Sequence, residues 1–309
     1  LGGGESVQTI LIMCAGIAVG KLLFPRRWAV GNGALQTVLT ILLIFTMGVS
    51  IGRNENLLQN LGSIGLASVA FCLLSMAGSV AVVYLSTRRI FPRQAGPDAA
   101  GGVTLPRKNR MVQAALAALL LGALCGVLGL GGAPLRFLVD SSDAVLNLLM
   151  LSVGIGIGMQ TGVLERLKRY HIKALIIPAG VVIGSLLGGV AGAAVTGYPL
   201  SEGLAIASCM GWYSLGGVTI EAASGSLYGG VAFLANLLRE ILSFFTIPLL
   251  AKYLNPPTCI AVAGATSEDT TLPMVMKYTS EEFVVLSVLN GALCSFLVPI
   301  LISLCYAVG

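Results

Sequence analysis

Apolar residues gather into long runs along the chain, and polar residues separate the runs. A helix needs about 20 mostly apolar residues to cross the hydrocarbon core of a bilayer. Eight runs come near that length, at residues 7–23, 34–52, 63–86, 111–131, 143–160, 174–196, 226–251 and 282–307. Two more stretches, 203–223 and 258–276, are apolar but interrupted by Gly, Ser, Thr, Pro and acids. The pattern predicts an all-α polytopic membrane protein with eight transmembrane helices plus two broken or re-entrant segments, or ten helices if both segments cross.

The composition supports a membrane protein and narrows its class. Hydrophobic residues make up 56% of the 309 residues and charged residues only 10%, whereas a soluble domain carries about 25% charged residues. The forty glycines favour a transporter or channel with closely packed or broken helices. The seven cysteines lie within or beside the apolar runs and show no metal-ligand spacing. We therefore expect no metal and no cofactor.

The basic residues predict the orientation of the chain. Of the 18 Lys and Arg residues, three lie in loop 21–33, six in 87–110 and four in 161–173, while the loops between them carry one each. The positive-inside rule places these three loops in the cytoplasm and the N-terminus outside. Because the net charge of +5 comes from such short loops, we expect no nucleic-acid partner.

An internal repeat divides the first two thirds of the chain. The glycines of "AGIAVGKL" and "MGVSIGRN" recur in "LGALCGVL" and "VGIGIGMQ" at a constant offset of 106 residues. Three spans separate equivalent positions, so the two units are expected to be inverted, as in many secondary transporters. We divide the chain into a first unit at 1–106, a second at 107–198 and a transport core at 199–309.

A weaker repeat relates the two interrupted stretches. "MGWYSLGGVT" aligns with "AGATSEDTTL" at an offset of 53 residues. If both stretches are re-entrant, this pair is inverted as well, with Lys252 and Lys277 in the cytoplasm and the C-terminus outside. If both cross fully, the pair is parallel. The charge of Lys252 favours the re-entrant interpretation.

The polar residues of these stretches predict one internal site, because non-helical backbone at membrane depth lines a wet cavity or lies buried in protein. "GWYSLGG" supplies Tyr213 and Ser214, and "GATSEDTTLP" supplies Thr266, Ser267, Glu268, Asp269 and Thr270. Half-helix ends that meet near the midplane offer N–H groups to a carboxylate and carbonyls to a cation. A zwitterion suits such a site.

The span between the two stretches carries charges of its own. In "NLLREILSFF", Asn236, Glu240 and Ser243 form one polar stripe that we expect to face the cavity, with Glu240 and Asp269 as its paired anionic groups. Arg239 is a further site candidate, although Arg239 and Glu240 are also interpretable as structural ion-pair residues. Glu268 and Glu221 are also interpretable as residues at aqueous ends.

The motifs "GWYSLGG", "AFLANLLREI…IP" and "GATSEDTTLP" resemble, in order and spacing, the signature stretches of the LysO family of bacterial lysine exporters, within the cation/proton antiporter and anion transporter superfamily. The resemblance is specific over residues 205–301. It implies export of L-lysine and of thialysine, linked to two intramembrane acids that correspond to Glu240 and Asp269. Two departures concern Glu221, which takes the place of a threonine, and Glu268, which replaces an apolar residue.

These observations combine into one expectation. The protein is a multi-pass carrier of the bacterial inner membrane and not an enzyme, and it exchanges L-lysine for protons at Glu240 and Asp269. The alternatives are a sodium/proton antiporter, with Na⁺ in place of protons, and an exporter of another cationic amino acid. An intramembrane aspartyl protease is disfavoured because the partner of Asp269 is a glutamate. The lipid bilayer is the expected environment, and a homodimer is left open.

Overall fold

The computed structural model describes residues 2–53, 57–91, 110–130, 132–159 and 175–308, and every regular element in these ranges is helical. The basic loop 161–173 and most of the loop 87–110 fall outside them. The α-helices are α1 (Gly2–Leu22), α2 (Ala29–Gly52), α3 (Leu57–Thr87), α4 (Arg110–Val127), α5 (Gly132–Asp140), α6 (Ser142–Met159), α8 (Ile176–Thr196), α9 (Leu200–Ser208), α10 (Tyr213–Ser224), α11 (Ser226–Tyr253), α12 (Pro256–Ala263), α13 (Leu272–Tyr278) and α14 (Glu281–Val308). Two short 3₁₀ helices, η1 (Arg26–Trp28) and η3 (Gly264–Glu268), join them.

The long helices confirm a polytopic membrane protein. Six helices of the described chain are long and apolar enough to cross a membrane, and they lie on α2, α3, α6, α8, α11 and α14. Shorter apolar helices at Leu11–Leu22 and Gln113–Val127 occupy the first and fourth predicted spans. The short helix α5 was not expected as a separate element. Large apolar side chains such as Leu22, Leu66 and Val195 stay more than 70% exposed on the helix surfaces, which suits contact with lipid.

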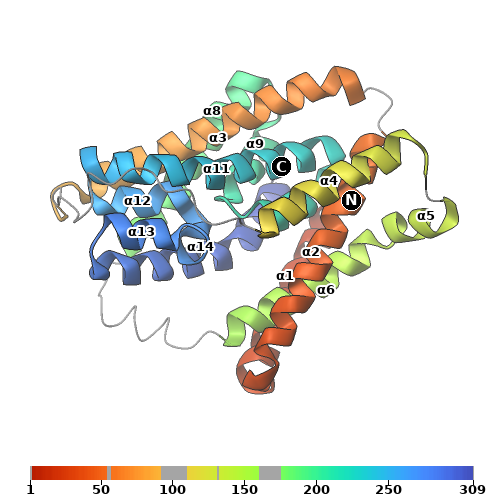
Figure 1. The fold of residues 1–309 in the computed structure, drawn as a ribbon, viewed down its shortest axis with the longest axis horizontal. Coiled ribbons are helices and arrows are strands. Elements are labelled where there is room, and N and C mark those ends of the chain that lie inside the picture. The colour runs from red at the N-terminus through yellow and green to blue at the C-terminus, as the bar shows by residue number, and fades with distance from the viewer. Residues whose placement is uncertain (1, 54–56, 92–109, 131, 160–174, 309) are drawn as a thin grey trace.

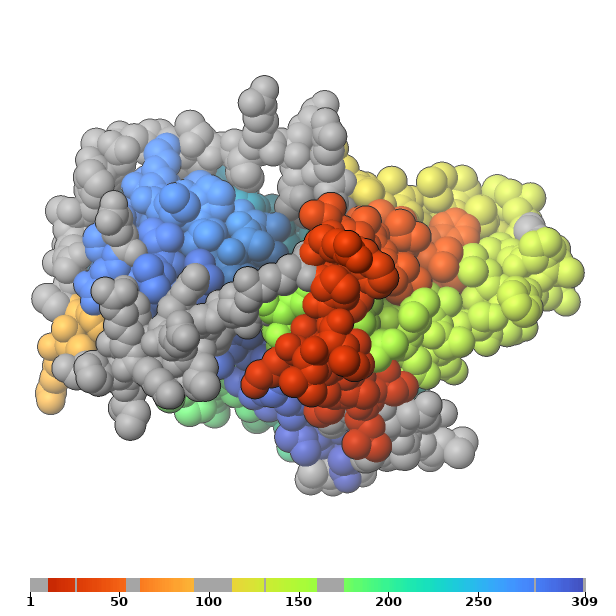
Figure 2. All heavy atoms as spheres, turned by 90° about the horizontal axis from the view of Figure 1, so that it is seen from below, coloured from red at the N-terminus to blue at the C-terminus, as the bar shows by residue number. Residues whose placement is uncertain are grey.

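The helices form two groups that pack against each other (Figure 1). We call α1, α2, α4 and α6 the four-helix bundle, and α3 with α8 to α14 the core bundle. In Figure 2 the four-helix bundle and α5 occupy one side of the visible face, in red to yellow-green, and the blue C-terminal helices lie on the other side. This grouping differs from the units predicted from the sequence, because α3 and α8, the third spans of the two predicted units, pack in the core bundle.

Closely spaced glycines let the helices of the four-helix bundle touch along their backbones. Gly16 and Gly20 on α1 face Gly154 and Gly158 on α6, and a Cβ atom built on Gly16 would lie 2.4 Å from the carbonyl oxygen of Leu151. Gly48 and Gly52 on α2 pack in the same way against Gly122 and Gly126 on α4. The glycine pairs found in the sequence are therefore packing positions, as small residues at membrane helix contacts usually are.

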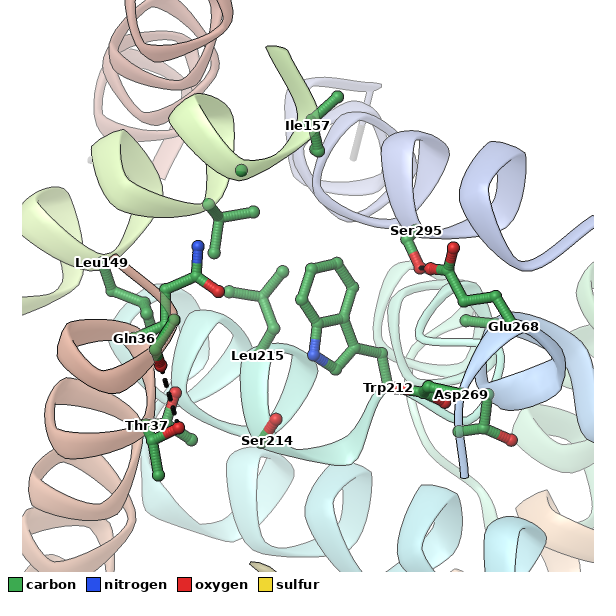
Figure 3. Close-up of a pocket in the computed structure, with 16 residues that line it drawn as sticks. Gln36, Thr37, Leu149, Ile157, Trp212, Ser214, Leu215, Glu268, Asp269 and Ser295 are labelled. Atoms are coloured by element: carbon green, nitrogen blue, oxygen red, sulfur yellow. Dashed lines mark hydrogen bonds between the residues drawn. The ribbon is translucent and has the colours of Figure 1, made fainter. Parts of the chain in front are cut away.

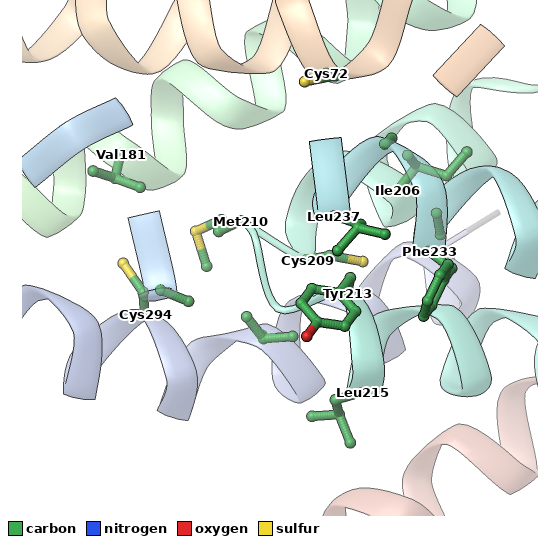
Figure 4. Packing of buried hydrophobic residues seen from close by; sticks show 14 of the residues in the cluster. Cys72, Val181, Ile206, Cys209, Met210, Tyr213, Leu215, Phe233, Leu237 and Cys294 are labelled. Atoms are coloured by element: carbon green, nitrogen blue, oxygen red, sulfur yellow. The ribbon is translucent and has the colours of Figure 1, made fainter. Parts of the chain in front are cut away.

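The core bundle is centred on an unwound stretch of chain. Cys209 and Met210, which connect α9 to α10, are fully buried and lie among apolar side chains of neighbouring helices (Figure 4). On the outer side of this centre, α3 and α8 pack antiparallel to each other, since Phe71 meets Gly192 and Val83 meets Gly180. The site described next lies where the unwound chain reaches the four-helix bundle.

Candidate functional site

The two broken segments, α9–α10 and α12–α13, meet at their unwound parts. The first segment is non-helical between Ser208 and Tyr213, and the second is without α-helix from Gly264 to Thr271. The N–H of Ala265 donates a hydrogen bond of 2.9 Å to the carbonyl of Met210. The two breaks thus support each other's backbone in the middle of the core bundle.

Glycine is required at both crossing points. Gly211 has φ of 101° and Gly264 has φ of 64° with ψ of −126°, conformations that side chains with a Cβ atom rarely adopt. A Cβ atom on Gly264 would also lie 2.2 Å from the carbonyl oxygen of Met210. The close approach of the two segments therefore depends on Gly264 having no side chain.

In each broken segment, an asparagine from a neighbouring long helix forms hydrogen bonds with the unwound backbone. Asn236 accepts a hydrogen bond of 2.8 Å from the N–H of Gly211 and donates to the carbonyls of Ile206 and Ala232. Asn290 on α14 donates to the carbonyl of Gly264 at 2.9 Å and to the hydroxyl of Ser267 at 3.0 Å. Side-chain amides thereby satisfy backbone groups that the helix breaks leave open.

Arg239 has a similar supporting position. Its side chain is 1% exposed and donates to the carbonyls of Ala261 and Val262, both at 3.1 Å. It also donates to the hydroxyls of Ser79 and Ser185 at 3.1 and 2.9 Å. The guanidinium charge lies at the C-terminal end of α12, where the helix dipole favours a cation.

A cavity of about 340 Å³ opens between the two bundles beside the crossing point. Figure 3 shows that α2 and α6 form one wall, while the first turn of α10, the η3 region and α14 form the other. The lining residues are Gly33, Gln36, Thr37, Thr40, Leu149, Val153, Gly156, Ile157, Trp212, Ser214, Leu215, Ala265, Thr266, Glu268, Asp269 and Ser295.

Three carboxylates gather at the core side of this cavity. Asp269 is exposed to the cavity and accepts a hydrogen bond from the N–H of Thr270. Glu268 accepts a hydrogen bond of 3.0 Å from the hydroxyl of Ser295. Glu240 lies behind them, 1% exposed, with Asp269 and Thr270 close enough to act on its charge. Acidic side chains on this wall suit a cationic ligand.

Trp212 lines the cavity and is drawn near the middle of the view in Figure 3. Its ring lies between Leu215 on one side and the Glu268–Asp269 pair on the other (Figure 3). Gln36 and Thr37 face it from α2. An aromatic face beside carboxylates favours an alkylammonium group through cation–π attraction as well as charge.

The residues predicted from the sequence fall into two sets. Ser214, Thr266, Glu268 and Asp269 line the cavity. Asn236, Arg239 and Ser267 are buried and hold the unwound backbone or its neighbours, and Tyr213 packs its ring against Phe233. The sequence interpretation missed Trp212, Gln36, Thr37 and Ser295, although the motif "GWYSLGG" contains the first of them.

Each broken segment begins and ends near the same point. At the start of α9, Glu202 accepts a hydrogen bond of 2.8 Å from Ser224, the last residue of α10. The rings of Tyr198 and Tyr228, just outside that segment, have centroids 5.2 Å apart.

The two ends of the second segment both contact Phe91, which follows α3. Asn255, which precedes α12, donates a hydrogen bond of 3.1 Å to the carbonyl of Phe91. The ring of Phe91 in turn contacts the ring of Phe283, which follows α13, at 5.5 Å. Within the described residues, no group of three or more His, Cys, Asp and Glu side chains is arranged to hold a metal ion.

Comparison with known proteins places this architecture in a family. Residues 116–306 match the family described as "Lysine exporter LysO". The chain is 30% identical to "Lysine exporter LysO" of Escherichia coli (strain K12), over 95% of this chain and 97% of that protein. It is also 34% identical to a Haemophilus influenzae protein named "Putative lysine exporter", over 63% of this chain and 95% of that protein.

Proposed function

The chain belongs to the LysO family of lysine exporters, and we propose that it exports L-lysine and analogues such as thialysine by exchange for protons. As a member of this family it is a multi-pass transporter of the inner membrane and not an enzyme. The observation that carries the proposal is the position of Asp269, exposed in a cavity between two helix bundles with Glu268 and Glu240 beside it.

The cavity offers separate groups to the two ends of lysine. Asp269 and Glu268 would bind the side-chain ammonium, with the ring of Trp212 along the alkyl chain. The first turn of α10 begins at Tyr213 and points its N-terminus at the same cavity. Because the first N–H groups of a helix lack intrahelical partners and carry partial positive charge, this turn and the hydroxyl of Ser214 would receive the α-carboxylate.

Proton exchange would use the same carboxylates. When the lysine ammonium departs, the carboxylates that bound it are left charged, and a charged side chain in a membrane interior is energetically unfavourable. We propose that Glu240 and Asp269 take up protons from the outside when lysine leaves, and lose them toward the cytoplasm when lysine binds. The buried position of Glu240 behind Asp269 would let the two groups share this task.

We further propose that both broken segments are re-entrant, so that eight helices cross the membrane. The contact of Glu202 with Ser224 joins the ends of the first segment, and Asn255 and Phe283 at the ends of the second segment both contact Phe91. These contacts support the re-entrant topology, because they keep the two ends of each segment close together. With the positive-inside rule, the N-terminus lies outside and the main cavity opens to the cytoplasm.

Transport of labelled lysine in proteoliposomes tests the function. We expect lysine counterflow by the purified protein and a rate of net transport that responds to a pH gradient. Uptake of Na⁺ in exchange for protons, without lysine counterflow, would favour a sodium/proton antiporter. Preference for arginine or ornithine over lysine would favour an exporter of another cationic amino acid.

A further inference from the structure

A second polar cavity lies at the opposite ends of α2 and α6 from the main one. Its volume is about 270 Å³. The main cavity contacts the first half of α2 and the second half of α6, whereas this cavity contacts the second half of α2 and the first half of α6. Its lining residues are Leu43, Thr46, Ser50, Val139, Ser142, Asp143, Leu146, Val218, Glu221, Ala222, Gly225 and Ser226.

The two cavities are lined by equivalent residues of the internal repeat. The second cavity takes seven lining residues from the two repeat units, and six of them have their equivalent, 106 residues away, in the lining of the main cavity. These pairs are Val139 with Gly33, Ser142 with Gln36, Asp143 with Thr37, Leu146 with Thr40, Leu43 with Leu149 and Ser50 with Gly156.

The contacts between helices follow the same 106-residue repeat. The repeat relates α1 to α4 and α2 to α6, so a two-fold axis must turn the α1–α6 contact into the α4–α2 contact. Both contacts exist, and both are made by the repeated glycines. The third helices, α3 and α8, pack antiparallel on each other, with Gly78 beside Gly184. Such self-pairing is expected only of elements that lie on the axis of an inverted repeat.

The second cavity has acidic side chains of its own. Asp143 lies in the first turn of α6, and Glu221 lies near the end of α10, where Ser50 interacts with its side chain. Hydroxyls of Thr46, Ser142 and Ser226 line the same space. Two carboxylates and several hydroxyls in a cavity of this size suit a primary ammonium group with part of its alkyl chain.

A layer of buried apolar side chains separates the cavities. Leu43 and Leu149 are equivalent in the repeat, and they are 3% and 1% exposed. Leu146, Leu215 and Val218 are buried in the same layer, and none of them is more than 6% exposed. The helix α10 runs past this layer, from Ser214 in the main cavity to Glu221 in the second.

We infer that the second cavity is the opposite vestibule of the transport path, in which Asp143 and Glu221 receive the ammonium group of the substrate after the apolar layer opens. The inference rests on the proposed function, because the symmetry relates two openings of one path. It assigns Glu221, an acid without a role at the main site, to the release side. The pseudo-two-fold axis explains how one pair of helices, α2 and α6, serves both openings in turn.

The test compares the two faces of the protein in proteoliposomes with labelled lysine. We expect the double variant Asp143→Asn/Glu221→Gln to raise the half-saturating lysine concentration about tenfold at the face of the second cavity, the scale of a lost charge-assisted hydrogen bond. At the face of the main cavity the change should be less than about twofold. Asp140→Asn, an exposed acid on α5 that does not line the cavity, is the matched control.

Labelling supplies a second measurement that does not depend on the double variant folding. Ser50→Cys and Thr37→Cys, placed in a background without Cys14, should react with an impermeant maleimide from opposite faces. Bound lysine should slow the reaction of both cysteines with the maleimide. Reaction of both cysteines from the same face would overturn the inference.

The outcomes separate the two proposals. If the double variant matches the wild type at both faces while Asp269→Asn loses transport, the vestibule is refuted and the proposed function stands. If the wild-type protein moves no lysine, both are refuted.

Discussion

The hydroxyl oxygens of Ser79 on α3 and Ser185 on α8 lie 2.9 Å apart, and Arg239 donates a hydrogen bond to each of them. The two serines are 106 residues apart, which is the offset of the internal repeat predicted from the sequence. One arginine therefore connects α3 and α8 to the end of α12, where it also binds the carbonyls of Ala261 and Val262. This geometry makes Arg239 a positioning residue, since its partners are hydroxyls and carbonyls.

Replacement of Arg239 should destabilise the fold. Arg239→Gln removes the guanidinium donors of the carbonyls of Ala261 and Val262, although the hydroxyl of Ser243 still donates to Val262 at 3.2 Å. We expect the loss to cost about 2 kcal/mol. Thermal unfolding in detergent should shift downward by several degrees. Arg136→Gln, which removes an exposed arginine on α5, should leave the midpoint unchanged. An unchanged midpoint for Arg239→Gln would contradict the positioning role.

The crossing of the broken segments should depend on Gly264. Gly264→Ala forces a Cβ atom into the carbonyl of Met210 and strains a backbone that only glycine adopts easily, so we expect a loss of roughly 2–3 kcal/mol. The control is Gly65→Ala on α3, where a Cβ atom meets nothing within 4 Å. Equal stability of the two variants, measured by thermal unfolding, would refute the tight crossing.

Trp212 should contribute to lysine affinity. Because a cation–π contact with tryptophan is worth about 0.5–2 kcal/mol, Trp212→Leu should raise the half-saturating lysine concentration about two- to thirtyfold. Trp212→Phe should retain part of the affinity. Trp28→Leu, which removes the other tryptophan away from the cavity, should behave as the wild type. Equal kinetics for Trp212→Leu and Trp28→Leu would remove Trp212 from the site.

The sequence predicted most of the membrane architecture because long apolar runs have few stable alternatives to spanning helices. It also predicted both helix breaks, since the polar motifs around Gly211 and Gly264 cannot face lipid. The direction of individual side chains was harder to predict. Asn236 and Glu240 lie on one stripe of α11, yet Asn236 turns to the backbone of Gly211, which only the packing of α9 and α10 decides.

Which residues form the cavity wall was equally hard to predict from the sequence. Gln36 and Thr37 lie in an ordinary apolar run of the sequence, and nothing in that run indicates a site. They reach the cavity because α2 packs across the first turn of α10, a contact between residues almost 180 positions apart. Helix α5 was missed because its sequence, GAPLRFLVD, is too short to span a membrane and combines Gly132 and Pro134 with the charged Arg136 and Asp140, a composition typical of a loop.

The topology has its own test. Under the re-entrant topology Lys252 lies in the cytoplasm, so Lys252→Cys should resist an impermeant reagent added to intact cells and react after permeabilisation. Arg136→Cys, in the segment between the fourth and fifth predicted spans, should react in intact cells. Both need a background without Cys14, which is exposed. Labelling of Lys252→Cys in intact cells would favour the topology in which both broken segments cross.

The role of Glu240 can be separated from that of its neighbour. Glu240→Gln keeps size and hydrogen-bonding capacity but removes the charge, and we expect transport to fall steeply while the protein still inserts. If Glu240 served instead to pair with Arg239, Glu240→Gln would lower stability and the double variant with Arg239→Gln would restore it. Rescue of this kind, seen in expression level and thermal midpoint, would show a structural ion pair.

Asp269→Asn in proteoliposomes tests the central claim most directly. The substitution preserves the shape of the cavity and removes the charge that compensates the desolvation of the lysine ammonium. We predict that lysine counterflow falls at least about a hundredfold, the scale of a lost partner for a buried charge, with normal insertion and an unchanged thermal midpoint. Lysine counterflow near the wild-type rate by Asp269→Asn would contradict the account.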